Sequence, residues 1–208
     1  VNEANSDQMD RLVRRLFALA EEMIIAEGPD TLAAFIAEPV MGRGGVVPPP
    51  EGYFQEIQAV LNKYDVLFIA DEVITGFGRT GKWFAMEHWG VQADIMSIGK
   101  AISAGYFPLG ISTVSAEVHD TLSQYVHIQT YNGHPGGCAA ALETIAILEE
   151  QDLLARGREN GAYFLERMQR LRDLPIVGDV RGLGMWTCVD FTSDKKTKAP
   201  FKDGTVQA

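Results

Sequence analysis

Hydrophobic and polar positions along the first part of the chain predict helices and strands in alternation. Apolar residues between Met9 and Glu27 recur every three to four positions, which predicts an amphipathic helix that Gly28-Pro29 ends. Ala33–Ala37 predicts a buried strand, Glu51–Tyr64 a helix, and Val66–Ala70 a second strand. We expect this strand–helix–strand unit to be parallel and right-handed.

Two more apolar runs and one long helix continue this pattern. Asp94–Ile98 and Leu109–Val114 predict strands, and the segment Pro135–Glu150, rich in Ala and Leu, predicts a helix. Strands that alternate with helices are typical of an α/β fold with a mostly parallel sheet.

The pattern changes after residue 150. Gln151–Arg172 predicts a charged amphipathic helix, and Leu174–Val180 and Gly184–Phe191 predict antiparallel strands that Arg-Gly-Leu-Gly separates. We therefore expect residues 1–150 to form part of a large α/β domain and residues 151–208 part of a small C-terminal α+β domain.

Composition and charge narrow the class of protein. The 208 residues are 46% hydrophobic and 22% charged, which is ordinary for a globular protein, and the net charge of −10 argues against nucleic-acid binding. No apolar stretch is long enough to span a membrane, and the chain does not open on a signal-peptide pattern. Cys138 and Cys188 are too few for a disulfide framework, so we expect free thiols in a reducing cytoplasm.

Chemically useful side chains stand at the ends of two predicted strands. Asp71 follows one apolar run and Lys100 closes another, and ligands of α/β sheets collect at the carboxyl ends of such strands. Thr130 adds a hydroxyl further on. A carboxylate, an amine and a hydroxyl suit pyridoxal phosphate (PLP), which has a basic ring nitrogen, an aldehyde and a phosphate. The structural alternatives are a turn-capping Asp71 and a solvated Lys100.

Two other motifs overlap in one glycine-rich segment. Gly76–Lys82 fits the first seven positions of a nucleotide-binding P-loop, but Trp83 stands where that motif needs Ser or Thr. Gly76-x-Gly78-x-x-Gly81 also fits a dinucleotide fingerprint, although four residues separate it from the preceding strand end. We favour a turn that the backbone requires. The histidines and cysteines show no metal-binding spacing, so we expect no metal.

Several segments, in one order, resemble the class III (omega) aminotransferase family. They are Glu-Pro-Val-Met-Gly from residue 38, Asp-Glu-Val-Ile-Thr-Gly from 71, Ser-Ile-Gly-Lys from 97, Thr-Tyr-Asn-Gly-His-Pro from 130, and Val-Arg-Gly-Leu-Gly from 180. The resemblance implies the PLP-dependent fold type I and a homodimer. Enzymes of this family are about twice as long, so we expect a fragment or an incomplete chain.

The resemblance also implies roles for particular residues. Lys100 would bond to the cofactor aldehyde and carry the proton, and Asp71 would keep the ring nitrogen protonated. Val73 would pack on one face of the ring. Thr130 would bind the phosphate of the neighbouring subunit's cofactor.

Two weaker candidates concern the substrate. Glu38 matches a glutamate that pairs with a switching arginine in some relatives, and that arginine would lie beyond residue 208. Trp83 and Phe84 could line a substrate pocket, but core packing is the reading that we favour for both.

The implied reaction is ping-pong transfer of an amino group from a primary amine or omega-amino acid to a keto acid, with pyruvate the expected acceptor. Ile74 stands where ornithine and GABA aminotransferases carry Gln, which favours the amine:pyruvate branch. The alternatives are diaminopelargonate, diamine and β-alanine transaminases, aminomutases, and an inactive fragment that binds PLP poorly.

Overall fold

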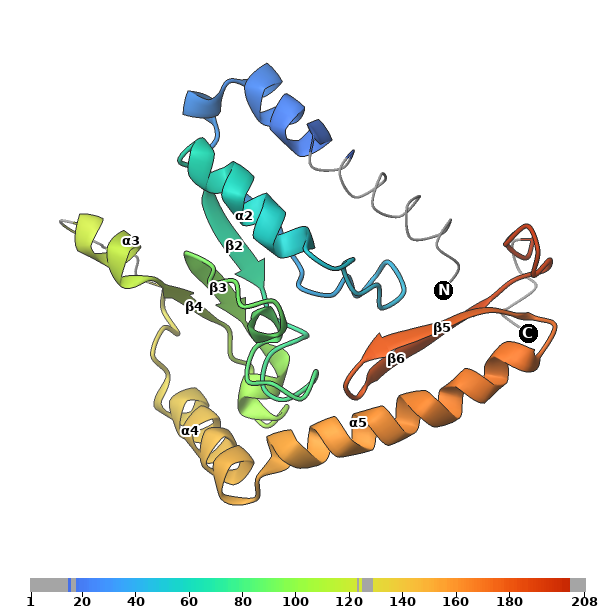
Figure 1. Cartoon of the computed structure of the whole chain (residues 1–208). Coiled ribbons are helices and arrows are strands. Elements are labelled where there is room, and N and C mark those ends of the chain that lie inside the picture. Colours follow the sequence, from blue (N-terminus) through green and yellow to red (C-terminus); the bar gives the residue numbers. More distant parts are fainter. Residues whose placement is uncertain (1–14, 16–17, 123, 125–128, 203–208) are drawn as a thin grey trace.

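The computed structural model describes residues 15, 18–122, 124 and 129–202. They form a four-stranded sheet with helices packed on it, a long helix and a two-stranded hairpin (Figure 1). After a helical stretch over 18–27, the strands and helices are β1 Ala34–Ala37, α2 Tyr53–Lys63, β2 Leu67–Asp71, β3 Ile95–Ile98, β4 Ile111–Val114, α3 Ala116–Thr121, α4 Pro135–Glu150, α5 Leu153–Gln169, β5 Val177–Leu183 and β6 Trp186–Phe191. Short 3-10 turns are η1 Pro29–Thr31, η2 Ala85–His88, η3 Lys100–Ser103 and η4 Arg170–Asp173.

The strands lie in the spatial order β1-β2-β3-β4. β1 pairs with β2 in parallel, as the sequence predicts, and β2 pairs with β3 in parallel with Asp71 opposite Ser97. β4 runs antiparallel to β3. Because β2 and β3 are parallel neighbours, their carboxyl ends meet at one edge of the sheet.

The main core lies between the sheet and α2, which covers one face (Figure 1). Phe54 and Ile57 of α2 are buried against Phe68 of β2, and the rings of Phe54 and Phe68 stack with centroids 5.8 Å apart. Burying side chains of this size contributes about 1.5–3 kcal/mol each. Ile24, from the helical stretch 18–27, joins the same cluster. The predicted residues 9–14, 16 and 17 of that helix lie outside the described part.

Two details of the predicted strands are wrong. β1 was expected to be buried on both faces, yet Ile36 is 60% exposed, because β1 is an edge strand and no described helix covers that side. The predicted Arg-Gly-Leu-Gly loop is also too long. Arg181 pairs with Cys188 and Leu183 with Trp186, so β5 continues to Leu183 and only Gly184-Met185 turns the chain.

α5 lies in the C-terminal part of the chain, after residue 150, and it packs on the glycine-rich segment 76–81 of the first part. A Cβ on Gly81 would fall 2.5 Å from Cγ of Arg158, and the Arg158 guanidinium donates to the Gly81 carbonyl at 2.9 Å. Gly78 meets Leu154 in the same way. Since α5 covers these glycines, the segment is a structural turn, and the nucleotide-loop interpretations fail.

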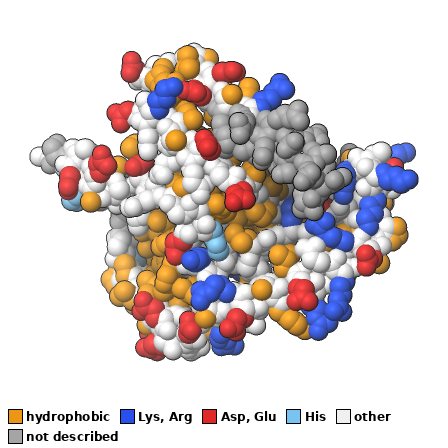
Figure 2. Space-filling model, in the orientation of Figure 1, with side chains coloured by type: hydrophobic (Ala, Val, Ile, Leu, Met, Phe, Trp, Pro, Cys, Tyr) orange, Lys and Arg blue, Asp and Glu red, His pale blue; other side chains and the backbone are white. Residues whose placement is uncertain are grey.

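Hydrophobic side chains gather on the face of the molecule around α4 (Figure 2). Leu142 of α4 is 68% exposed, and Tyr106 and Tyr131 are more exposed still. Within the described residues, no helix combines the length and apolar character needed to cross a membrane.

Candidate functional site

Asp71 stands at the carboxyl end of β2, half-buried beside the sheet edge. Its Oδ1 accepts a hydrogen bond from the backbone N–H of Val73 at 3.1 Å, so it caps the turn as the structural alternative predicts. Its other carboxylate oxygen has no hydrogen-bond partner among the described residues. Capping therefore uses one oxygen and leaves the second for a ligand.

Lys100 begins η3 two residues after β3 ends. Gly99 before it is buried, whereas Lys100 itself is exposed among the described residues. Lys100 also has a left-handed φ, 44°, which costs a residue with a Cβ about 1–2 kcal/mol. Strained backbone of this kind gathers at functional sites.

Val73 connects the two strand ends. A Cβ placed on Gly99 would lie 3.3 Å from Cγ1 of Val73, so the valine packs directly on the backbone beside Lys100. The structure thus brings Asp71, Val73 and Lys100 to one edge of the sheet, as the sequence predicts.

The side chains of Asp71 and Lys100 open on different hollows. Asp71 shares its hollow with Glu38 and Tyr53. Lys100 lies in a cleft of about 900 Å³ between η3, the segment 77–79 and α4. The flexible four-carbon stem of lysine lets its amine move between such positions.

Glu38 belongs to a cluster centred on Gly42. Its Oε2 accepts from the Gly42 N–H at 2.9 Å. A Cβ on Gly42 would lie 3.1 Å from both Ile74 and Trp186, so side chains from three parts of the fold meet there. Glu38 is therefore held beside the hollow that Asp71 lines.

Other sequence candidates lie apart from this edge. Trp83 packs edge-on against Phe77 with ring centroids 6.2 Å apart, and Phe84 packs on the same ring at 5.5 Å, so both take part in the aromatic packing around Phe77. Thr130 is exposed in the turn before α4, and no described contact joins it to Asp71 or Lys100. His134 caps α4 by accepting from the Gly136 N–H, so its role is structural.

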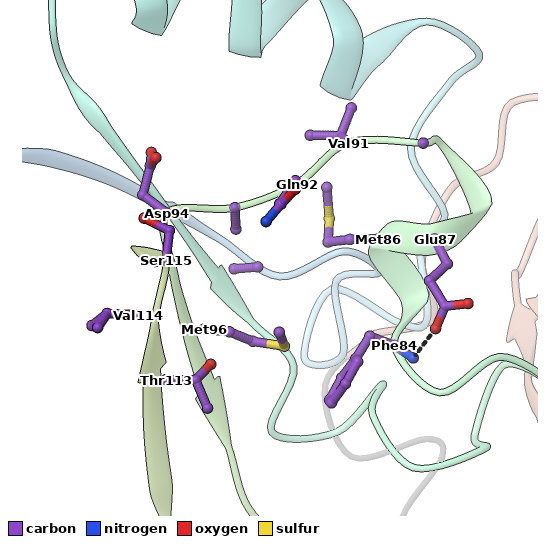
Figure 3. A pocket seen from close by; sticks show the side chains of 13 residues that line it. Phe84, Met86, Glu87, Val91, Gln92, Asp94, Met96, Thr113, Val114 and Ser115 are labelled. Atoms are coloured by element: carbon purple, nitrogen blue, oxygen red, sulfur yellow. Dashed lines mark hydrogen bonds between the residues drawn. The ribbon is translucent and has the colours of Figure 1, made fainter. Parts of the chain in front are cut away.

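A third hollow lies over Ala70 and Met96, whose side chains alternate with those of Asp71 and Ser97 and so point away from the candidate edge (Figure 3). Its two carboxylates each accept one backbone hydrogen bond: Glu87 from the Phe84 N–H at 2.8 Å (Figure 3), and Asp94 from the Phe68 N–H at 2.7 Å. Neither Asp71 nor Lys100 lines this hollow.

Sequence reasoning missed Glu72, which is 0% exposed. Burial raises the pKa of its carboxyl, while hydrogen bonds from Thr75, Met86 and Ala85 act in the opposite direction. The available signal was an acidic residue inside an apolar run with a threonine three positions later.

It also missed Arg181, which joins the hairpin to the loop after Glu38. Its guanidinium bonds to Asp190 at 2.5 Å, to Asp179 at 3.1 Å and to the Gly45 carbonyl at 2.9 Å.

Comparisons with known proteins agree with this geometry. The family model described as "Aminotransferase class-III" matches residues 1–207. The chain belongs to the class-III aminotransferases. A diaminobutyrate–2-oxoglutarate transaminase of Halomonas elongata is 50% identical over 88% of this chain and 41% of its own length. A gamma-aminobutyrate transaminase of tomato, Solanum lycopersicum, is 46% identical over 90% of the chain and 37% of its own.

Solved structures of class-III aminotransferases share the fold. An (S)-enantioselective omega-transaminase from Thermomicrobium roseum superposes with a TM-score of 0.90 at 48% identity, over 93% of this chain and 44% of that one. The chain therefore has part of the α/β fold type I of PLP-dependent transaminases. It spans less than half the length of these relatives.

The class-III family depends on PLP, and the residues at the sheet edge fit that group. Asp71 offers a free carboxylate oxygen, Lys100 an amine without a partner in the described part of the chain, and Val73 an apolar surface between them.

Proposed function

We propose that the protein containing this chain is a PLP-dependent transaminase, with Asp71 and Lys100 as its catalytic residues. The observation that carries the proposal is their position at the carboxyl ends of neighbouring parallel strands, with Asp71 in register with Ser97, three residues before Lys100. We also place the boundary between the large and small domains near residue 150, where α4 ends and α5 begins.

Each residue has a distinct task in this proposal. The cofactor, when bound, supplies an electron sink for the electron pair left on the substrate carbon. The free oxygen of Asp71 supplies the negative charge that keeps a proton on a basic ring nitrogen. The Lys100 Nζ would take the proton from the substrate carbon as general base and deliver it to the aldehyde carbon of the cofactor as general acid. Val73 excludes water from one side of the cofactor ring.

Thr130 is proposed to act in a homodimer. No described contact joins it to Asp71 in its own chain, Tyr131 beside it is 82% exposed, and hydrophobic side chains gather on the face around α4 (Figure 2). A second copy that covers this surface would bring Thr130 to the other subunit's phosphate.

The proposed substrates are a primary amine or omega-amino acid and a keto acid. Glu38 and Ile74 meet at Gly42 beside the Asp71 hollow, and this position supports a role for both in selecting the amine. Ile74 favours pyruvate as the acceptor. One relative is named for diaminobutyrate and another for gamma-aminobutyrate, so overall sequence identity does not distinguish between these substrate branches of the family.

Borohydride reduction after addition of PLP tests the proposal. Intact-mass and peptide analysis should find one pyridoxyl group on Lys100. The adduct should persist in Lys63→Ala, which removes an exposed lysine paired with Glu21, and disappear in Lys100→Ala. An unmodified protein, or a label spread over several lysines, would contradict the assignment.

A further inference from the structure

Glu72 is a carboxylate enclosed entirely by protein, at 0% exposure. Thr75 donates its hydroxyl to Oε2 at 2.5 Å, the Ala85 N–H donates to the same oxygen at 3.0 Å, and the Met86 N–H donates to Oε1 at 2.9 Å. A buried carboxylate is costly without such partners, so these three donors explain how the side chain is accommodated.

This network matters because Glu72 lies between Asp71 and Val73, two residues of the candidate site. Glu72 directly follows Asp71, the last residue of β2, and precedes Val73, the first residue of the turn after the strand. The Glu72 N–H also donates to the Ser97 carbonyl of β3 at 2.9 Å. Glu72 is therefore tied to η2 through its side chain and to the strand before Lys100 through its backbone.

The same residue closes the loop that follows. Its carbonyl accepts from the Gly76 N–H at 3.0 Å, and its carboxylate draws the backbone of Ala85 and Met86 against the end of β2. Val73, inside this loop, reaches the backbone of Gly99. Moving the Glu72 carboxylate would therefore move both residues that flank it.

We propose that Glu72 is a positioning residue that sets Asp71 and Val73 at the distance from Lys100 that the cofactor requires. This inference rests on the proposed function. Glu72 does not touch the reacting atoms, and it acts through the rigidity of the strand end.

Thr75 offers a mild way to disturb the network, because Thr75→Val keeps the shape and removes one donor, whereas Thr75→Ser keeps the donor. We expect Thr75→Val to raise the Kd for PLP about tenfold, as the loss of one hydrogen bond to a charged group predicts. It should also lower kcat without changing KM for the amine, and Thr75→Ser should restore both quantities. Amide exchange at Ala85 and Met86 in the cofactor-free protein should be faster in the valine variant than in the serine variant.

Glu87→Gln is the matched control, since it alters an exposed carboxylate of the same 3-10 turn that bonds only to the Phe84 N–H. Equal PLP affinity and equal amide exchange in the valine and serine variants would overturn the inference, and so would an equal loss in Glu87→Gln. If the parent protein forms no adduct on Lys100, the proposed function fails and this inference fails with it. If the parent protein forms the adduct but the Thr75 variants do not differ from each other, this inference fails and the proposed function stands.

Discussion

Gly161 of α5 and Gly184 of the hairpin turn lie backbone to backbone. A Cβ added to Gly161 would fall 2.4 Å from the carbonyl carbon of Gly184. Gly184 in turn approaches the backbone of Thr80, where its own Cβ would lie 2.6 Å from the carbonyl carbon. The helix, the hairpin and the glycine-rich segment therefore meet where no side chain fits.

Gly161→Ala should destabilise the fold by about 1–3 kcal/mol, because backbone atoms must separate to admit the methyl group. Gly157→Ala on the same helix is the matched control. Its nearest atom, the Gly78 carbonyl oxygen, is 3.4 Å away, so the higher helix propensity of alanine should add about 0.5–1 kcal/mol. Urea unfolding of both variants measures the difference, and similar midpoints would refute this packing.

Lys100→Gly should stabilise the protein relative to Lys100→Ala by about 1 kcal/mol, because glycine adopts a φ of 44° without strain. Both variants should lose the pyridoxyl adduct. Ala104→Gly, at a φ of 49°, should gain similar stability and keep the adduct. Thermal unfolding with mass analysis tests this, and a glycine variant no more stable than the alanine variant would show that Lys100 is unstrained.

Asp71→Asn should keep the adduct and lower turnover about 100-fold, because removing a neighbouring negative charge lowers a cation's pKa by one to three units. The asparagine oxygen can still accept from the Val73 N–H, so stability should change little. Asp94→Asn is the control, since Asp94 accepts from the Phe68 N–H at the opposite edge of the sheet. Unchanged turnover in Asp71→Asn would remove Asp71 from its role.

Arg181→Met should cost about 2–3 kcal/mol, because it leaves Asp190 and the Gly45 carbonyl without a charged donor. Arg181 is 18% exposed, whereas Arg172, which pairs with the same Asp179, is 50% exposed. Arg172→Met should therefore cost less than about 1 kcal/mol. Equal losses measured by urea unfolding would show that the hairpin does not depend on Arg181.

Glu72 should make stability depend on pH. Burial raises its pKa in the folded state above the ordinary value of 4.5, so the folded state binds the proton more tightly than the unfolded state. Its contribution is complete below pH 4.5 and is lost as the pH rises through the folded pKa. The free energy of unfolding of the parent protein, relative to Glu72→Gln, should therefore fall as the pH rises from about 4.5. A difference that stays constant with pH would show that Glu72 does not titrate.

Features that depend on neighbouring residues were predictable from the sequence, and features that depend on distant contacts were not. The apolar runs before Asp71 and Lys100 identified two strand ends, and their parallel pairing placed both residues at one edge. The contact between Arg181 and Gly45 joins residues 136 positions apart, and no local pattern signals it. The exposure of Ile36 was missed because an apolar run does not reveal what covers a strand.

The left-handed backbone at Lys100 also affects how this chain can evolve. Because glycine would fold more easily at that position, selection for stability alone favours losing the lysine. A lineage that no longer needed the amine would be expected to replace it early. Under the proposed function, Lys100 is kept for its amine at a cost in stability.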